Sequence, residues 1–141
     1  MSEKKPILMA LTPEAEAAIG GEKLVLKHFP FRIGREFRVA LVDGAMQVTE
    51  RRRQNASAPN NDLYLKDQGR LLNVSRQHLQ IERDEEGAYR VVDRGSACGT
   101  LVGNNHIGGH DQGGECPLQD GEVLVVGTSE SPFVFHFVVE E

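Results

Sequence analysis

The sequence predicts an all-β protein, an antiparallel β-sandwich of about ten to eleven short strands. Short segments of alternating apolar and polar residues recur between turn-forming residues along the chain. The clearest case is residues 73–93, where two such segments flank an Asp-Glu-Glu-Gly turn. No long helical or heptad period appears. Strands of this length separated by turns favour a sandwich.

The early part of the chain combines short strands with one helix candidate. Gly20-Gly21 ends the helix candidate. Gly34 suits a sharply bent backbone at a strand end, which leaves the Arg35 side chain to emerge from the bend. The expected strands are 7–11, 24–28 and 31–33, and the expected helix is 14–19.

Residues 36–60 predict a long, partly mobile loop, although 38–42 has some strand character. Residues 54–61 are polar and contain proline, which is typical of loops. Two interpretations stay open for this loop: it contacts a partner, or it is a disordered insertion.

The rest of the chain returns to strands, with a glycine-rich loop expected at 103–114. A turn-rich segment, 93–100, follows the central hairpin. The expected strands are 63–65, 78–81, 89–92, 101–102, 122–126 and 133–139.

Length and composition indicate one soluble globular domain of residues 1–141. The chain is 39% hydrophobic and 26% charged. It has no apolar run near the roughly 20 residues of a membrane helix, and its first six residues are too polar for a signal peptide. We therefore expect a cytoplasmic protein without membrane contact.

The net charge of −5 argues against nonspecific nucleic-acid binding. The charge is divided, however. Residues 23–76 carry eleven Lys and Arg against five Asp and Glu, whereas residues 77–141 carry three against twelve. A basic segment in an acidic chain suggests a local anion site. The plain alternative for Arg51-Arg52-Arg53 is a solvated loop.

The tetrapeptide Ser75-Arg76-Gln77-His78 lies at the mouth of the central hairpin, where a rigid strand can hold a loop residue against a ligand. Ser75 and His78 raise the alternative of a nucleophile and its base. Alternate side chains on a strand point to opposite faces, and no Gly-x-Ser-x-Gly motif surrounds the serine. We therefore expect no enzyme.

A second alternative is a zinc site built from two thiols and two imidazoles. The cysteines are not in Cys-x-x-Cys pairs, so we expect no metal. A disulfide is disfavoured in a reducing cytoplasm, which leaves two unpaired thiols. The candidate ligands are Cys98, His106, His110 and Cys116.

Five motifs, in the same order along some hundred residues, resemble those of forkhead-associated (FHA) domains, the phosphothreonine-reading β-sandwiches. Any one of them is a weak match, but five in order are specific. They are FRIGRE at 31–36, NDLYLKD at 61–67, NVSRQHLQI at 73–81, VVDRGSACGTLV at 91–102 and LQDGEVLVVG at 118–127.

The resemblance implies a ligand site in loops at one end of the sandwich, with Arg35 and Ser75 binding phosphate and Arg76 supporting it. It also implies that His78 braces the binding loops from inside. A phosphate needs forked cationic donors and a neutral hydroxyl or amide, which guanidinium and serine supply. The remaining structural support would come from Gly34, Gly99 and Thr100.

The sequence departs from the family pattern on the opposite rim. Cys98 holds the place of an asparagine that commonly bonds to the ligand backbone, and Gly103 stands where a second asparagine is frequent. Asn104 is displaced by one position. Peptide contacts would therefore fall on Ala97, Cys98 and Asn104. The 36–60 loop is a further departure, since the family has only a few residues there.

The function that these features predict is a cofactor-free binding module for phosphothreonine-containing protein segments, acting as an adaptor in Ser/Thr-kinase signalling. Its partner would be a phosphoprotein, either a kinase or a kinase substrate. The alternative is a domain of the same fold that binds proteins independently of phosphate.

Overall fold

A computed structural model describes residues 4–35, 38–42, 45–50, 61–66, 73–75 and 77–140; for 38–42 and 45–50 it describes the backbone. The thirteen strands of the described residues are β1 (Lys5–Ala10), β2 (Lys23–Val25), β3 (Phe31–Arg35), β4 (Arg38–Val42), β5 (Ala45–Glu50), β6 (Leu63–Leu65), β7 (Leu79–Arg83), β8 (Tyr89–Asp93), β9 (Thr100–Val102), β10 (Asn105–Ile107), β11 (Gly114–Leu118), β12 (Val123–Val126) and β13 (Val134–Glu140).

One short helix, α1 (Pro13–Ile19), follows β1, as the sequence predicts. The Thr12 side chain caps its first turn by accepting a bond from the backbone N–H of Ala15. Gly20 ends it in the left-handed conformation, with a φ of 75°. No helix in the described part of the chain is long and apolar enough to cross a membrane.

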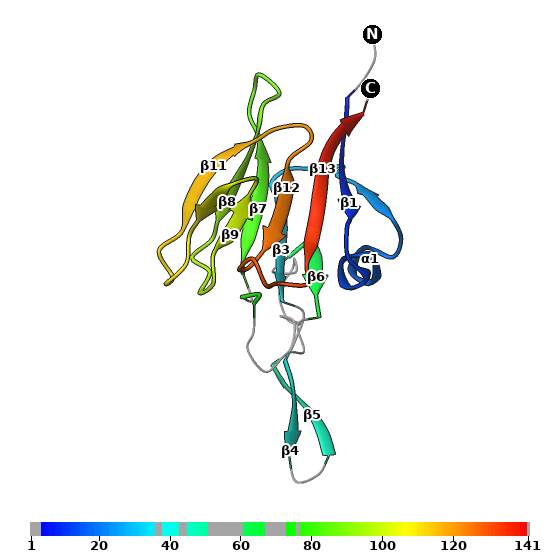
Figure 1. The fold of residues 1–141 in the computed structure, drawn as a ribbon, viewed down its shortest axis with the longest axis vertical. Helices are drawn as coiled ribbons and strands as arrows, with labels where there is room; N and C mark the ends of the chain where they lie inside the picture. Colours follow the sequence, from blue (N-terminus) through cyan, green and yellow to red (C-terminus); the bar gives the residue numbers. More distant parts are fainter. Residues whose placement is uncertain are drawn as a thin grey trace.

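Eleven strands form two facing sheets, which confirms the predicted sandwich (Figure 1). One sheet has the order β10-β9-β12-β13-β1-β2 and the other β11-β8-β7-β3-β6. β3 and β6 pair in parallel, which departs from the expected antiparallel arrangement. A parallel pair needs a crossover connection, and the long 36–60 segment supplies the necessary length.

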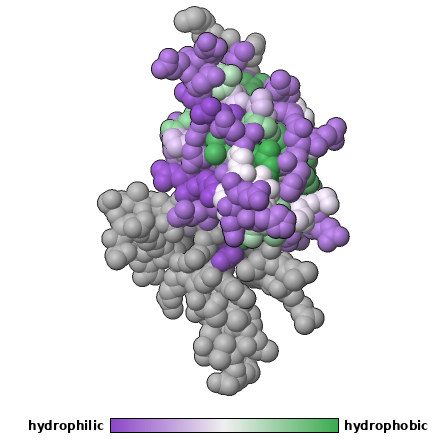
Figure 2. All heavy atoms as spheres, turned by 90° about the vertical axis from the view of Figure 1, so that its left-hand side faces the viewer, coloured by the Kyte–Doolittle hydropathy of each residue, from purple (hydrophilic) through white to green (hydrophobic). Residues whose placement is uncertain are grey.

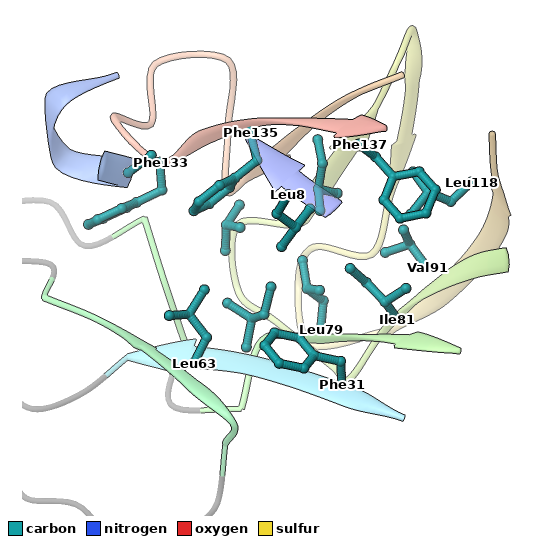
Figure 3. Packing of buried hydrophobic residues seen from close by; sticks show 14 of the residues in the cluster. Leu8, Phe31, Leu63, Leu79, Ile81, Val91, Leu118, Phe133, Phe135 and Phe137 are labelled. Atoms are coloured by element: carbon teal, nitrogen blue, oxygen red, sulfur yellow. The ribbon is translucent and has the colours of Figure 1, made fainter. Parts of the chain in front are cut away.

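The core lies between the two sheets (Figure 3). Phe135 and Phe137 of β13 are fully buried and alternate with half-buried neighbours. Side chains of the five-stranded sheet face them, among them Leu79, Ile81 and Val91, all fully buried. Burying each such side chain contributes roughly 1.5–3 kcal/mol. This packing fixes the strand ends from which the ligand-facing loops emerge.

Two expected loops contain strands. Part of 36–60 is a hairpin, because β4 and β5 pair in a separate two-stranded antiparallel sheet. The 103–114 segment holds β10 and the start of β11. A tight turn at Gly103, where φ is 58°, lets the chain reverse directly from β9 into β10.

Gly34 also differs from expectation. It is a paired strand residue opposite Tyr64, and β3 continues through it to Arg35. A bend at this glycine was therefore a wrong prediction.

The side of the molecule on which β11 lies has an apolar area near its centre, surrounded by hydrophilic residues (Figure 2). Ile107 of β10 and Cys116 of β11, the outer strands of the two sheets, are only half-buried and pack against the core.

Candidate functional site

Three segments that are distant in sequence meet at one end of the sandwich. They are the end of β3, residues 73–75 before β7, and the loop from β8 to β9. In Figure 1 this is the end beyond which the β4–β5 hairpin lies, away from the two termini.

Arg35 is joined to the 73–75 segment by its backbone and by its guanidinium. Its N–H donates to the carbonyl of Ser75 at 2.9 Å, and its Nη1 donates to the carbonyl of Val74 at 2.8 Å. The residue is 9% exposed. The structure therefore brings together Arg35 and Ser75, the two residues predicted to contact phosphate directly.

His78 links two loops through its ring. Its Nδ1 accepts the backbone N–H of Ser75 at 3.0 Å, so the ring proton is on Nε2, which donates to the carbonyl of Gly99 at 2.7 Å. The side chain is fully buried. With both nitrogens engaged by backbone groups, His78 acts as a brace and does not deprotonate the Ser75 hydroxyl. This geometry removes the arrangement needed for serine nucleophilic catalysis.

The Ser75 hydroxyl reaches the opposite rim instead. Its Oγ accepts the backbone N–H of Ala97 at 3.1 Å. Ala97 is exposed and Ser75 is half-buried, so this contact lies at the surface, between the two rims.

The β8–β9 loop is organised by one buried carboxylate, that of Asp93. Its Oδ1 accepts the backbone N–H groups of Gly95 and Ser96, at 3.0 and 2.8 Å. Its Oδ2 accepts the hydroxyls of Ser96 and Thr100, at 2.6 and 2.9 Å. The Ser96 hydroxyl in turn accepts the N–H of Gly99 at 2.9 Å. The Asp93 carboxylate and the Ser96 hydroxyl thus hold the loop by hydrogen bonds at Gly95, Ser96, Gly99 and Thr100.

Asp93 and Ser96 hold this loop in place, and the sequence prediction did not assign them. The signal was present, since both belong to the Asp-x-x-Ser-x-x-Gly-Thr spacing. Thr100 and Gly99, which were predicted as supports, take part in the same hydrogen-bond network.

Position 99 requires a glycine, because of its backbone conformation and because of the atoms that surround it. Its φ is 85°, and a Cβ there would lie 2.5 Å from Nε2 of His106 and 2.9 Å from the carbonyl of Ile107. A side chain at this position would push the β8–β9 loop away from β10.

The predicted peptide-contacting residues separate into two groups. Cys98 lies in the β8–β9 loop beside Ala97, half-buried, with its carbonyl 3.4 Å from Nε2 of His106. Asn104 lies in the turn between β9 and β10, at the other end of β9 from Gly99. A three-residue strand spans roughly 10 Å, so the structure does not bring Asn104 to the same rim. The predicted role of Arg76 lies outside the described residues.

The possible metal ligands do not converge. Among the described residues, no group of three or more His, Cys, Asp or Glu side chains is placed to hold a metal ion. The two cysteines are not joined in a disulfide. Burial, with a smaller effect from Glu122, raises the pKa of Cys116, which disfavours the thiolate that a metal would require.

The fold is shared with several solved structures of low sequence identity. Full-length yeast Pml1p is 17% identical with a TM-score of 0.62, covering 99% of this chain and 84% of that one. The FHA domain of the CT664 protein from Chlamydia trachomatis is 17% identical with a TM-score of 0.55, covering 97% of each chain.

A third similar structure, Mycobacterium tuberculosis EmbR in complex with a low-affinity phosphopeptide, is 22% identical with a TM-score of 0.55. It covers 95% of this chain, which spans 24% of the length of the mycobacterial protein. No curated protein sequence matches the chain.

The sequence itself settles the family. Residues 31–127, more than half of the chain, match the family model described as the FHA domain. That range contains all three segments that meet at the end of the sandwich. The chain therefore belongs to the FHA domain family, a family of phosphopeptide-binding interaction modules.

Proposed function

We propose that this chain is a single domain that binds phosphothreonine-containing protein segments, with the phosphate held by Arg35 and Ser75. The observation that carries the proposal is the bond from the Arg35 N–H to the Ser75 carbonyl, which fixes the two residues side by side at a loop rim. Arg76 follows Ser75 directly and is proposed to support the same phosphate. Guanidinium and hydroxyl donors together suit a dianionic group with three acceptor oxygens.

The proposed setting is Ser/Thr-kinase signalling in the cytoplasm, with the domain acting as an adaptor for a kinase or its substrate. Cys98 and Cys116, which are not joined in a disulfide, suit a reducing compartment.

The loops of the site are held together by hydrogen bonds within the chain, such as those of the His78 ring. Such preorganisation lowers the entropic cost of binding.

The preference for threonine over serine would rest on one methyl group. Burying a methyl contributes about 0.8 kcal/mol, or roughly fourfold in affinity. A larger preference would need the stiffer rotamer of the β-branched residue to present the phosphate.

Titration of matched peptides tests the proposal. A phosphothreonine peptide should bind, its unphosphorylated form should bind at least roughly 100-fold more weakly, and Arg35→Ala should lose a similar factor, since each charge-assisted bond contributes about 1.5–3 kcal/mol. Arg90→Ala is the matched control, because that arginine is exposed on β8 and already paired with Glu82. Affinity should also fall below about pH 6, where the phosphate takes up its second proton.

Equal affinity for the phosphorylated and unphosphorylated peptides would reject the proposal and favour a phosphate-independent interaction domain. An Arg35→Ala variant that is folded and keeps full affinity would reject the assigned site.

A further inference from the structure

The six-stranded sheet has an outer face, turned away from the core, and the strand register shows which residues belong to it. Successive side chains of a strand lie on opposite faces, so the neighbours of a core residue belong to the outer face. Leu8 of β1 and its partner Phe137 of β13 belong to the core. The adjacent pair, Ile7 and Val138, therefore lies on the outer face, and Val25 of β2, which pairs with Ile7, joins it there. These three residues form an apolar row across three strands.

A second row crosses the middle of this face. Met9 of β1 pairs with His136 of β13, which in turn pairs with Val123 of β12. Leu11 lies two residues after Met9, and its N–H donates to the carbonyl of Val134 at 3.0 Å. Leu11 is 52% exposed and Val123 38% exposed, and they are the two exposed large hydrophobic side chains of the described residues. Both lie on the same face of the same sheet.

A third row extends the apolar surface to β9. Val125 of β12 pairs with Val134 of β13 on one side and with Leu101 of β9 on the other. Ile7 and Val125 are buried, yet neither belongs to the core cluster between the sheets. Their burial therefore comes from neighbours on the outer face, which packs as a continuous apolar surface.

The outer face of the five-stranded sheet is different. One of its rows runs from Arg32 through Val92 to Glu115. The next row contains the ion pair of Glu82 and Arg90. An antiparallel sheet with one face in water normally carries polar residues on that face. The apolar outer face is therefore a property of the six-stranded sheet and is not required by the sandwich as such.

The charged residues of the six-stranded outer face lie at its margin. Lys23 is on the edge strand β2, and Lys5 and Glu140 are register partners at the ends of β1 and β13. The polar ring within the three rows, that of His136, donates from Nε2 to the carbonyl of Gly121 at 3.0 Å. An apolar centre with a polar margin is the arrangement found in protein interfaces.

A second copy of the chain fits this face by charge and by shape. Each chain carries a net charge of −5, so two copies repel each other unless they meet at an uncharged surface. The three rows provide such a surface, and two of them can stack without leaving a charge unpaired. One sheet face also suits another in shape, because sheets pack face to face about 10 Å apart. A twofold dimer needs this kind of self-complementary patch.

The area of the sheet is consistent with a dimer interface. Its six strands, of three to seven residues each, cover roughly 400 Å² in plan, at about 4.8 Å between strands and about 3.4 Å per residue. Stable interfaces bury about 800 Å² of accessible surface per partner, which includes the relief of the side chains. The strands therefore supply the centre of such an interface, and the charged margin supplies the rest.

We infer that the outer face of the six-stranded sheet is the interface of a homodimer, in which two copies of this chain stack these sheets face to face about a twofold axis. The candidate phosphate site lies in loops at one end of the sandwich and not on this face, so both copies keep it open. The inference goes beyond the proposed function and does not depend on it.

Sedimentation velocity at protein concentrations between roughly 1 and 300 μM tests the inference, because a dimer forms by mass action. The proteins are the unmodified chain, Leu11→Lys, Val123→Lys and, as matched control, Val92→Lys. All three replaced side chains are exposed or half-buried, so the folded monomer can accept a lysine. The control places the same change on the outer face of the other sheet.

The unmodified chain and Val92→Lys should shift to twice the monomer mass with the same dissociation constant. The dimers of Leu11→Lys and Val123→Lys should be at least roughly tenfold weaker, because each interface would bury an ammonium group without a partner. The unfolding temperature should rise with protein concentration for the first two proteins and rise less for the other two. Similar unfolding temperatures at the lowest concentration confirm that all four chains are folded.

An unmodified chain that stays monomeric at the highest concentration would overturn the inference and leave the face to a different protein. Two other results would also overturn it: both variants of this face dimerise as tightly as the unmodified chain, or Val92→Lys weakens the dimer to the same extent. Affinity for a phosphothreonine peptide is measured separately and should be equal for all four proteins. Failure of the proposed function is thus distinguishable from failure of the dimer.

Discussion

Asp93 and Arg94 are neighbours in sequence, yet they belong to two different kinds of polar cluster. The Asp93 carboxylate is 3% exposed and accepts four hydrogen bonds, all from residues 95–100. The half-buried Arg94 lies on the opposite side of the strand, where it shares Asp62 with Arg32. The first cluster consists of hydrogen bonds to one buried carboxylate, and the second contains two neighbouring guanidinium groups beside one carboxylate.

The two clusters differ in how much they contribute to the stability of the folded domain. A buried polar group with all its partners supplied by the protein contributes to the folded state, and its loss leaves donors unsatisfied. An ion pair that is partly exposed to solvent contributes little to folding, because water screens its charges. We therefore expect substitutions in the two clusters to differ in how much they lower the stability.

The largest effect should come from Asp93→Ala. Removing the carboxylate leaves two backbone N–H groups and two hydroxyls without their acceptor, so we expect a loss of roughly 3–5 kcal/mol in the free energy of unfolding. Urea denaturation measures this directly. A loss below about 1 kcal/mol would mean that the loop re-forms around water, and the contrast between the clusters would disappear.

Arg94→Gln should have a much smaller effect on stability, within about 1 kcal/mol. Removing one of two neighbouring guanidinium groups relieves repulsion with Arg32, which offsets part of the loss of the hydrogen bond to Asn61. The same urea experiment measures it. A destabilisation comparable with that of Asp93→Ala would identify Arg94 as a structural residue.

The smallest effect should be the pH dependence contributed by Glu82. The hydrogen bond from Arg90 lowers the pKa of Glu82 below its usual value of 4.5. Because the pKa is lower in the folded state, the ion pair stabilises the folded protein at pH values above 4.5. This contribution is lost as the pH falls through the folded-state pKa. The pair is largely exposed, so the effect is small.

Thermal unfolding of the unmodified chain and of Glu82→Gln between pH 6 and pH 3 tests this prediction. The two proteins should converge in unfolding temperature at the acidic end. A constant difference across the range would contradict it.

Much of the sandwich could be predicted from sequence because alternation in β7, β8 and β13 follows directly from one buried face. β5, β10 and β11 were not predicted. β10 has only three residues, of which two are exposed and one is half-buried. Its sequence therefore shows no alternation of apolar and polar residues that would predict a strand. β5 lies between the Asp43-Gly44 turn signal and a polar, proline-containing segment, 54–61, which together favoured a loop.

The residues of the candidate site that belong to the sequence motifs could be predicted, because their side chains have recognisable hydrogen-bonding and charged groups. Arg35, Ser75 and His78 were named from the sequence, and the structure places them in one bonded group. The role of His78 as a brace depends on which atoms its ring nitrogens meet, which a sequence does not contain. The proximity of Arg32 and Arg94 was not predicted, because their positions are 62 apart and only the strand order β8-β7-β3-β6 brings them to one face. The role of Arg76 stays a prediction.

The parallel pairing of β3 and β6 bears on how such a domain can vary between proteins. The chain leaves β3 at Arg35 and re-enters the sheet at Leu63, which is paired with Ile33, only two residues back along the neighbouring strand. The two ends of the intervening segment are thus anchored side by side, whatever its length. Because doubling a closed loop costs only about 0.6 kcal/mol, this junction is a place where evolution can lengthen or exchange a segment beside a ligand site without remaking the fold.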